Sequence, residues 1–324
     1  MAAVIANAEE RGLDFLAITD HDRSMHGAPT QWHDPEYRSE KMILLYGVEW
    51  TTAKGHGNLW SDKPFDYAPL WQANLDLDPQ TAIAAAHTQN ALFSINHPAA
   101  YNCCAWEYAV SPEVDCIEVW NAPFRVPNKS HLAVRDIWDG LLLSGRVLPG
   151  VGGSDSHQLV GLQSNVNLHG SPATWVYAQE PTARSVLTAI EAGRISISYS
   201  AYADRVELDL DTDGDGIFEV MQGDVIPAVS TPITLRVEVH GPAFRERGFL
   251  HRKRYTALIY RNGTVIKRKR MRSGYDSFTF EDTPEGRTYY RVELRGSPEI
   301  GLLQRLLFGR VLGLTNPIYI GYER

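Results

Sequence analysis

The sequence contains only three cysteines, Cys103, Cys104 and Cys116, among its 324 residues. Three thiols make no disulfide framework, and no C-x-x-C pair is present that would suggest a zinc ribbon. We therefore expect buried thiols. Cysteine usage leaves the cellular compartment open.

The chain also lacks long apolar runs and an excess of positive charge. No run reaches the roughly 18 residues that a membrane-spanning helix needs, and the first residues, MAAVIANAEERG, carry charges where the apolar core of a signal peptide would end. The formal net charge is −8, which disfavours general binding to nucleic acid or to an anionic membrane. We expect a small-molecule substrate as the partner. The oligomeric state stays open, and any export signal would lie upstream of Met1.

Up to about residue 200, short β-rich runs alternate with helical patterns. The predicted strands are Phe15–Thr19, Ile43–Val48, Gly57–Trp60, Leu92–Ile95, Cys116–Trp120, Leu148–Gly152 and Thr174–Tyr177. The predicted helices are Ala2–Arg11, Thr81–Asn90, Ser130–Ser144 and Thr182–Ala192. This alternation is typical of parallel strands joined by crossover helices. Seven strands favour an α/β fold of the barrel type over an open sheet.

The pattern changes after about residue 203. TPITLRVEVHG alternates apolar and polar residues, as a half-buried strand does. Asn262-Gly263 separates two further strands and indicates a hairpin. We expect a β/α barrel over residues 1–202, followed by a small antiparallel β-sandwich over residues 203–324.

Chemically reactive residues follow most of the predicted strands of the first part. They are Asp20, His21 and Asp22; Glu49; Asn96 and His97; Asn121; and Asp155 and His157. His56 comes shortly after Glu49 in KGHGN. In parallel α/β proteins the carboxyl ends of the strands form the active-site face. The pattern therefore places these groups in one cleft.

Histidines and carboxylates together suit zinc, manganese or iron. No serine lies in a G-x-S-x-G elbow, so metal-activated water is the expected nucleophile. Glu49 is the candidate for a carboxylate that bridges two ions. Each histidine alone has a structural interpretation, and Asp22 has one as an N-cap. The group His21, Glu49, His56, His97, Asp155 and His157 is harder to explain in that way.

These residues also carry a family resemblance. LDFLAITDHD, GVEWTTAKGHGN, SINHP, CIEVWN and GVGGSDSH resemble the ordered motifs of the PHP family, named for polymerase and histidinol phosphatase domains. The sequence is most similar to its carbaryl-hydrolase-like branch, where a C-terminal β domain ends in a segment like LTNPIYIG. The likeness extends over most of the chain.

The resemblance implies a distorted seven-stranded β/α barrel with two or three divalent metal ions. Glu49 matches the bridging glutamate, and His56 and His97 match ligands of one ion beside it. Asp155 matches a ligand of another ion, and His21 and His157 match ligands of a third. The family's activities are mainly phosphoester hydrolysis, with carbamate ester hydrolysis in the closer branch.

One departure from the family concerns its first strand, which bears H-x-H-T followed by S-D-G before the first helix. Here the first predicted helix begins at the start of the sequence given. Two interpretations are open: the reading frame continues upstream, or the chain is a degenerate member. We favour the first.

The sequence thus predicts a metal-dependent hydrolase that acts on a phosphoester or a carbamate-type ester. The alternative is a degenerate, non-catalytic binding protein. Asp20 and Asp155 are candidates to orient ligands or carry protons. Trp120 and Asn121 are candidates to line the substrate pocket, with a core tryptophan and a turn-capping asparagine as the open alternatives.

A second metal site is suggested by DLDTDGDGIFEV. Asp211, Asp213 and Asp215 follow the start of a calcium-loop pattern. The twelfth position is Gln222 where an EF-hand has glutamate, so a solvated acidic turn is the alternative. The basic run Lys267–Arg272 indicates a charged edge strand rather than a binding patch.

Overall fold

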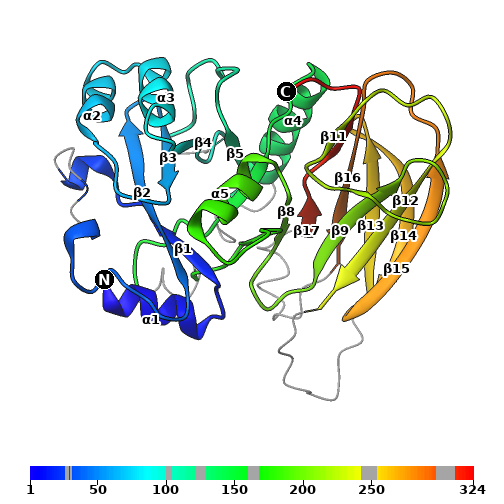
Figure 1. Cartoon of the computed structure of the whole chain (residues 1–324), viewed down its shortest axis with the longest axis horizontal. Coiled ribbons are helices and arrows are strands. Elements are labelled where there is room, and N and C mark those ends of the chain that lie inside the picture. Colours follow the sequence, from blue (N-terminus) through cyan, green and yellow to red (C-terminus); the bar gives the residue numbers. More distant parts are fainter. Residues whose placement is uncertain are drawn as a thin grey trace.

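The first half of the chain folds around a mixed six-stranded sheet that curves into a half-barrel (Figure 1). The computed structural model describes residues 1–25, 29, 31–99, 104–121, 129–159, 168–241, 254–296 and 311–324. The strands of this sheet, in spatial order, are β1 (Phe15–Ile18), β2 (Ile43–Thr52), β3 (Gly55–Ser61), β4 (Leu92–Ile95), β5 (Cys116–Asn121) and β6 (Gly150–Gly153).

Five α-helices occur within the described residues. They are α1 (Ala2–Glu10), α2 (Ala68–Leu75), α3 (Pro79–His87), α4 (Lys129–Leu143) and α5 (Ala183–Glu191). Sequence analysis missed α2. The α3 helix begins after Asp78, whose carboxylate accepts hydrogen bonds from the backbone N–H groups of Gln80 and Thr81, an N-cap. None of the helices in this described part has the length and apolar character needed to cross a bilayer.

The prediction of a seven-stranded β/α barrel is wrong. β3 runs antiparallel to both β2 and β4, because a two-residue loop joins β2 to β3 where a crossover helix was expected. The last predicted strand, β7 (Ala173–Val176), pairs with β8 (Ile195–Ser198) in a different sheet. In the part of the chain that the structure describes, β1 pairs only with β2 and β6 pairs only with β5. The sheet is therefore open between β1 and β6.

The β2–β3 hairpin depends on Gly55. This residue has φ of +140°, and a Cβ atom on it would lie 2.9 Å from the ring of Trp106 and 3.0 Å from the Cα atom of Trp106. A larger residue would therefore push the loop away from the Trp106 segment. The hairpin matters because it sets Glu49 and His56 on neighbouring strands.

The second half of the chain contains two sheets that face each other. The smaller sheet has the order β10 (Val220–Met221), β9 (Arg205–Asp211), β12 (Ile233–His240) and β15 (Tyr275–Asp282). The larger, eight-stranded sheet joins β7 and β8 to β11 (Val225–Ile226), β13 (Arg254–Arg261), β14 (Thr264–Arg272), β16 (Thr288–Arg295), β17 (Val311–Thr315) and β18 (Ile318–Ile320). Buried side chains such as Leu208, Val237, Ile259 and Val292 fill the space between the sheets.

Two local predictions for this half agree with the structure. Asn262 and Gly263 form the loop of the β13–β14 hairpin with φ of +49° and +74°, as a type I′ turn requires. The basic run Lys267–Arg272 lies in β14, which within the described residues pairs only with β13 and is an edge strand. Of the three cysteines, Cys116 is buried and Cys104 is half-buried. Cys103 lies outside the described residues.

Residues from both halves complete the strand β6. The side chain of Asn316 accepts a hydrogen bond from the Gly150 N–H and donates one to the Gly150 carbonyl, both at 2.7 Å. The Thr174 hydroxyl bonds the Gly152 N–H and carbonyl in the same way, at 3.0 and 2.7 Å. The eight-stranded sheet contains strands from both sides of residue 202. The predicted domain boundary between residues 202 and 203 therefore stays a prediction.

A buried ion pair fixes α4 against β16. Arg291 is 1% exposed, and its guanidinium donates two hydrogen bonds to Asp139, at 2.9 and 2.6 Å. The same guanidinium bonds Glu293 at 2.9 Å, and Tyr289 donates to Asp139 at 2.8 Å. The buried Arg291 charge is thus paired with two carboxylates, only one of which is partly reached by solvent.

Removing Asp139 should cost far more stability than removing an exposed partner. Asp139→Ala leaves the Arg291 charge buried with only part of its compensation, and we expect a loss of about 3–5 kcal/mol in the free energy of unfolding. The matched control is Asp62→Ala, which breaks the exposed bidentate pair with Arg184 and should cost about 0–1 kcal/mol. Urea unfolding measures both. Equal losses would contradict this assignment.

Candidate metal centre

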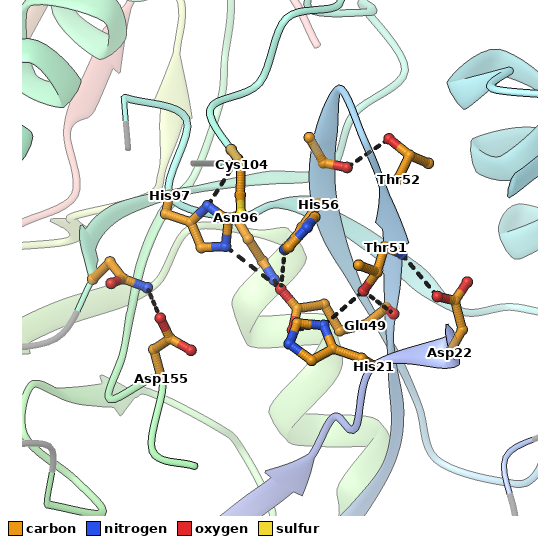
Figure 2. A network of polar contacts seen from close by, with 12 residues as sticks. His21, Asp22, Glu49, Thr51, Thr52, His56, Asn96, His97, Cys104 and Asp155 are labelled. Carbon is orange, nitrogen blue, oxygen red and sulfur yellow. Dashed lines mark hydrogen bonds and ion pairs between the residues drawn. The ribbon is translucent and has the colours of Figure 1, made fainter. Parts of the chain in front are cut away.

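Glu49 is the centre of a cluster of nitrogen atoms. It lies on β2, is 7% exposed, and its Oε1 atom lies 3.1 Å from His56 Nδ1, 3.0 Å from the donating Asn96 Nδ2 and 3.5 Å from His97 Nε2. Its Oε2 atom lies 3.0 Å from His21 Nδ1. Figure 2 shows these side chains directed at the one carboxylate. Burial alone would raise the pKa of Glu49, but the hydrogen bonds with His56 and His97 and the charge of His21 hold it well below its usual range.

His21 reaches Glu49 because the β1–β2 pairing continues past β1 as an isolated bridge between these two residues. Its Nδ1 atom faces the Glu49 carboxylate and the Thr51 hydroxyl, at 2.8 Å. A carboxylate only accepts hydrogen bonds, so Nδ1 carries the proton and Nε2 has the lone pair in the neutral ring. That Nε2 atom lies 3.5 Å from Nε2 of His157.

His157 has the same tautomer. Its Nδ1 atom lies 2.9 Å from the backbone carbonyl of Asp155, which fixes the proton on Nδ1. The two Nε2 lone pairs of His21 and His157 therefore face each other. Two facing lone pairs repel unless a proton or a cation lies between them. The separation of 3.5 Å suits two ligands of one ion, since nitrogen ligands about 2.0–2.1 Å from zinc in a tetrahedral arrangement lie about 3.4 Å apart.

His97, on the other side of Glu49, is also held through its Nδ1 atom by a backbone carbonyl. Its Nδ1–H donates to the carbonyl of Cys104 at 3.1 Å, and its Nε2 atom lies 3.5 Å from the Glu49 carboxylate, which it faces with a proton when the ring is charged and with a lone pair when the ring is neutral. Burial lowers the pKa of His97, but the hydrogen bond with Glu49 and the negative charge of Glu118 outweigh it and raise the pKa to about 9. A cation between His97 and Glu49 would relieve the same repulsion that a proton relieves here.

Two of the predicted ligands have unusual backbone conformations. His97 has φ of +28° and Asp155 has φ of +48°. Such angles are uncommon for residues other than glycine and persist only where the surroundings enforce them. Here the Glu118 carboxylate accepts the His97 N–H at 2.7 Å, and Asn121 donates to both Glu118, at 3.0 Å, and Asp155, at 3.4 Å.

Three further polar residues support this cluster: Glu118, which the sequence pattern did not single out, and Asn96 and Asp22, for which it predicted no such role. Glu118 is buried, and burial raises its pKa to about 7, against the opposing effect of the His97 charge. Asn96 donates to Glu49 directly. Asp22, for which an N-cap was the structural alternative, is fully buried and accepts hydrogen bonds from the Thr51 N–H, the Tyr67 hydroxyl and Asn74. The sequence does contain a signal for Glu118, which is a charged residue within the apolar run CIEVWN. A charge buried in this way needs polar partners, so it marks a polar cluster in the core.

The cluster opens into a cleft of about 1110 Å³ between β1 and the β6–β7 region. The predicted residues that line it are Asp20, His21, Glu49, His97, Asn121, Asp155 and His157. His56 lies just behind, against Glu49. Trp120 is 3% exposed and packs in the main hydrophobic core, as its alternative interpretation requires. A substrate contact by Trp120 would need that core to open, whereas Asn121 is placed for one.

The donor set fits a divalent cation. His21, Glu49 and His56 have ligand atoms within 4.8 Å of one another, and His97 and His157 each turn a ring lone pair toward this group. Imidazole and carboxylate are the ligands that zinc, manganese and iron accept. Which of these metals binds stays a prediction, and so does the assignment of individual ligands to individual ions.

The second candidate site is the turn after β9. Asp211, Asp213 and Asp215 each have a carboxylate oxygen within 4.8 Å of the others. The Asp211 carboxylate accepts hydrogen bonds from the N–H groups of Gly214 at 2.7 Å and Gly216 at 2.9 Å. These backbone bonds account for the turn without an ion, and calcium binding there stays a prediction.

Comparison with known proteins adds little to this geometry. No protein-family model matches the chain, and no curated protein does. Among solved structures, a two-domain protein from Bacteroides vulgatus that contains a predicted PHP-like metal-dependent phosphoesterase is similar at 14% identity, over 98% of this chain and 89% of that chain, with a TM-score of 0.45.

Two further matches are structures of a CARDB domain from Pyrococcus furiosus. The crystal structure, in complex with di-metal ions, is 15% identical over 38% of this chain and 97% of that chain, with a TM-score of 0.24. The solution structure is 16% identical over 37% and 98%, with a TM-score of 0.22. None of these three is described as a carbaryl hydrolase. At such scores the likeness identifies neither a family nor an activity for this chain.

Replacing Glu49 by glutamine should remove metal. Glu49→Gln keeps the size of the side chain but deletes the negative charge on which the histidines converge, so we expect the metal content after dialysis to fall by at least one ion per chain. Elemental analysis by plasma mass spectrometry measures this. Glu40→Gln is the matched control, because Glu40 is an exposed carboxylate at the same cleft. If Glu49→Gln keeps its full metal content, Glu49 is not a ligand.

Proposed function

We propose that this chain is a metal-dependent hydrolase whose reaction takes place in the cleft over Glu49. The observation that carries the proposal is the pair of facing lone pairs on His21 and His157. Nδ1 of each ring is engaged by an acceptor, so the two Nε2 atoms are left facing each other 3.5 Å apart, where they can share a cation, at the wall of a cleft large enough for a small molecule.

The residues that would hold the ions are His21 and His157 on one side, and Glu49 with His56 and His97 on the other. A divalent cation bound there supplies a Lewis acid and lowers the pKa of water toward roughly 7. The proposed substrate is a phosphoester, because imidazole groups and divalent cations suit the anionic oxygens of a phosphoryl group. A carbamate-type ester is the alternative substrate within the same reaction class.

The remaining residues have proposed roles in positioning and in proton transfer. Asp155 lies with its Oδ1 atom 3.3 Å from Nδ1 of His157 and orients that ring. Asp20 is exposed and lines the cleft, so it can exchange a proton with solvent. Asn121 is held by Glu118 and faces the cleft, where its amide group can bind a substrate oxygen.

Hydrolysis assays with matched variants test the proposal. With added Mn²⁺ or Zn²⁺, we expect the chain to hydrolyse bis-p-nitrophenyl phosphate. His157→Ala should lower kcat/KM by at least about 100-fold, since it removes a group that holds the ion. Glu40→Gln should stay within about twofold of the unchanged chain. An aryl N-methylcarbamate, assayed in parallel, decides between the two substrate classes.

A chain that binds metal in the cleft and hydrolyses neither substrate would overturn the proposal. That outcome would instead support the non-catalytic binding protein that the sequence left open. Hydrolysis that survives His157→Ala unchanged would show that the reaction does not use this side of the cleft.

A further inference from the structure

A second cluster of charged side chains lies on the smaller sheet of the C-terminal half. Antiparallel pairing of β9 with β12 sets Glu207 directly opposite Glu238, and Arg205 opposite His240. These side chains are on the face turned away from the hydrophobic core, because the alternating residues Val206, Leu208, Val237 and Val239 point into it. Like charges directly opposite each other destabilise a strand pair, so this pair needs a positive partner.

The neighbouring arginines compensate the two glutamates unequally. Arg205 Nε donates to Glu207 Oε1 at 2.7 Å. Arg236 donates instead to Asp209, at 2.8 and 3.2 Å, and its Nε atom lies 3.7 Å from Glu238 Oε2, too far for a hydrogen bond. Glu238 Oε1 accepts the Tyr275 hydroxyl at 3.1 Å. Each glutamate thus engages Oε1 and presents Oε2 to the same point.

The third group at that point is His240 Nε2. It lies 3.4 Å from Glu207 Oε2 and 3.5 Å from Glu238 Oε2. The atom is buried and has no hydrogen-bond partner among the described residues. By contrast, the exposed pair His87–Asp115 has a nitrogen–oxygen distance of 2.9 Å, an ordinary hydrogen bond. The His240 ring is aimed at two carboxylates but bonded to neither.

We propose that Glu207, Glu238 and His240 form a divalent-cation site that is separate from the cleft. Ligand atoms about 2.0–2.2 Å from a tetrahedral zinc ion lie about 3.3–3.6 Å apart, and the two distances to His240 Nε2 are 3.4 and 3.5 Å. All three ligand atoms lie within 4.8 Å of one another. One imidazole and two carboxylates suit zinc or a similar transition metal, with a fourth position left for water.

The ion would cross-link β9 and β12 through its ligands Glu207 on β9 and Glu238 and His240 on β12. It would offset the part of the repulsion between Glu207 and Glu238 that Arg205 and the more distant Arg236 leave uncompensated. Arg205 also packs over the ring of Trp175, 5.2 Å from its centroid, and Trp175 lines the cleft. The ion would therefore stabilise β9, whose Arg205 contacts the cleft residue Trp175, without contributing a ligand to the cleft.

Zinc binding to paired variants tests this site apart from the cleft. The background is Glu49→Gln, which weakens the metal centre in the cleft. In this background we expect zinc chloride at about 100 times its dissociation constant to raise the melting temperature by about 5 °C. Adding His240→Ala, or the isosteric Glu238→Gln, should abolish the shift and remove one zinc ion per chain by elemental analysis. His87→Ala, the matched histidine control, should change neither quantity.

Two results would overturn the proposal. One is an equal zinc content with and without His240→Ala, and the other is no zinc-dependent rise in the Glu49→Gln background. In either case the His240 imidazolium is itself the positive partner of the two glutamates. His240→Ala alone should leave hydrolysis in the cleft within about twofold, so failure of this site and failure of the proposed function are distinguishable.

Discussion

The buried carboxylate of Glu49 is the constraint on which the half-barrel depends. Moving one carboxylate out of water costs several kcal/mol unless partners replace its hydration. Here the partners are His21, His56, His97 and Asn96, and they come from three places: after β1, within β3 and after β4. Each of these elements must therefore end where its side chain reaches one point. The short β2–β3 hairpin, which sets His56 beside Glu49, follows from the same requirement.

The partners are in turn held by a second layer of buried polar groups. Thr51 bonds His21, and its backbone N–H bonds the buried carboxylate of Asp22. The Glu118 carboxylate holds the His97 backbone in its strained conformation. Such layers fix the tautomer and direction of each ring before any ion binds. The arrangement is rigid because the rings are positioned by strands and buried bonds rather than by exposed loops.

The existence of the strands was predictable from the sequence, but several of their ends and their pairing were not, since β2 continues past Glu49 to Thr52 and His56 lies within β3. Short apolar runs followed by His21, Glu49, His97 and Asp155 located the cluster, because this signal is local. The two-residue loop between Thr52 and Gly55 has no Asn-Gly signature, so the sequence does not reveal that β2 and β3 form an antiparallel hairpin, and the barrel prediction is wrong. Glu118 lies within the predicted strand Cys116–Trp120, where no local pattern marks its contact with His97. The Glu207–Glu238 pair depends on a register between strands about 30 residues apart, which no local pattern specifies.

The two edge strands of the half-barrel, β1 and β6, differ in what lies beside their free backbone edges. On β6, Asn316 and Thr174 bond the N–H and carbonyl groups of Gly150 and Gly152, so side chains take the place of a neighbouring strand. On β1, residues 15–18 are all half-buried and line the cleft. The sheet therefore stays open on the side of the cleft, while the strand that leads to Asp155 and His157 is fixed by residues 174 and 316. The geometry of the candidate metal centre thus depends on the C-terminal half of the chain, even though all of its candidate ligands lie in the first 157 residues.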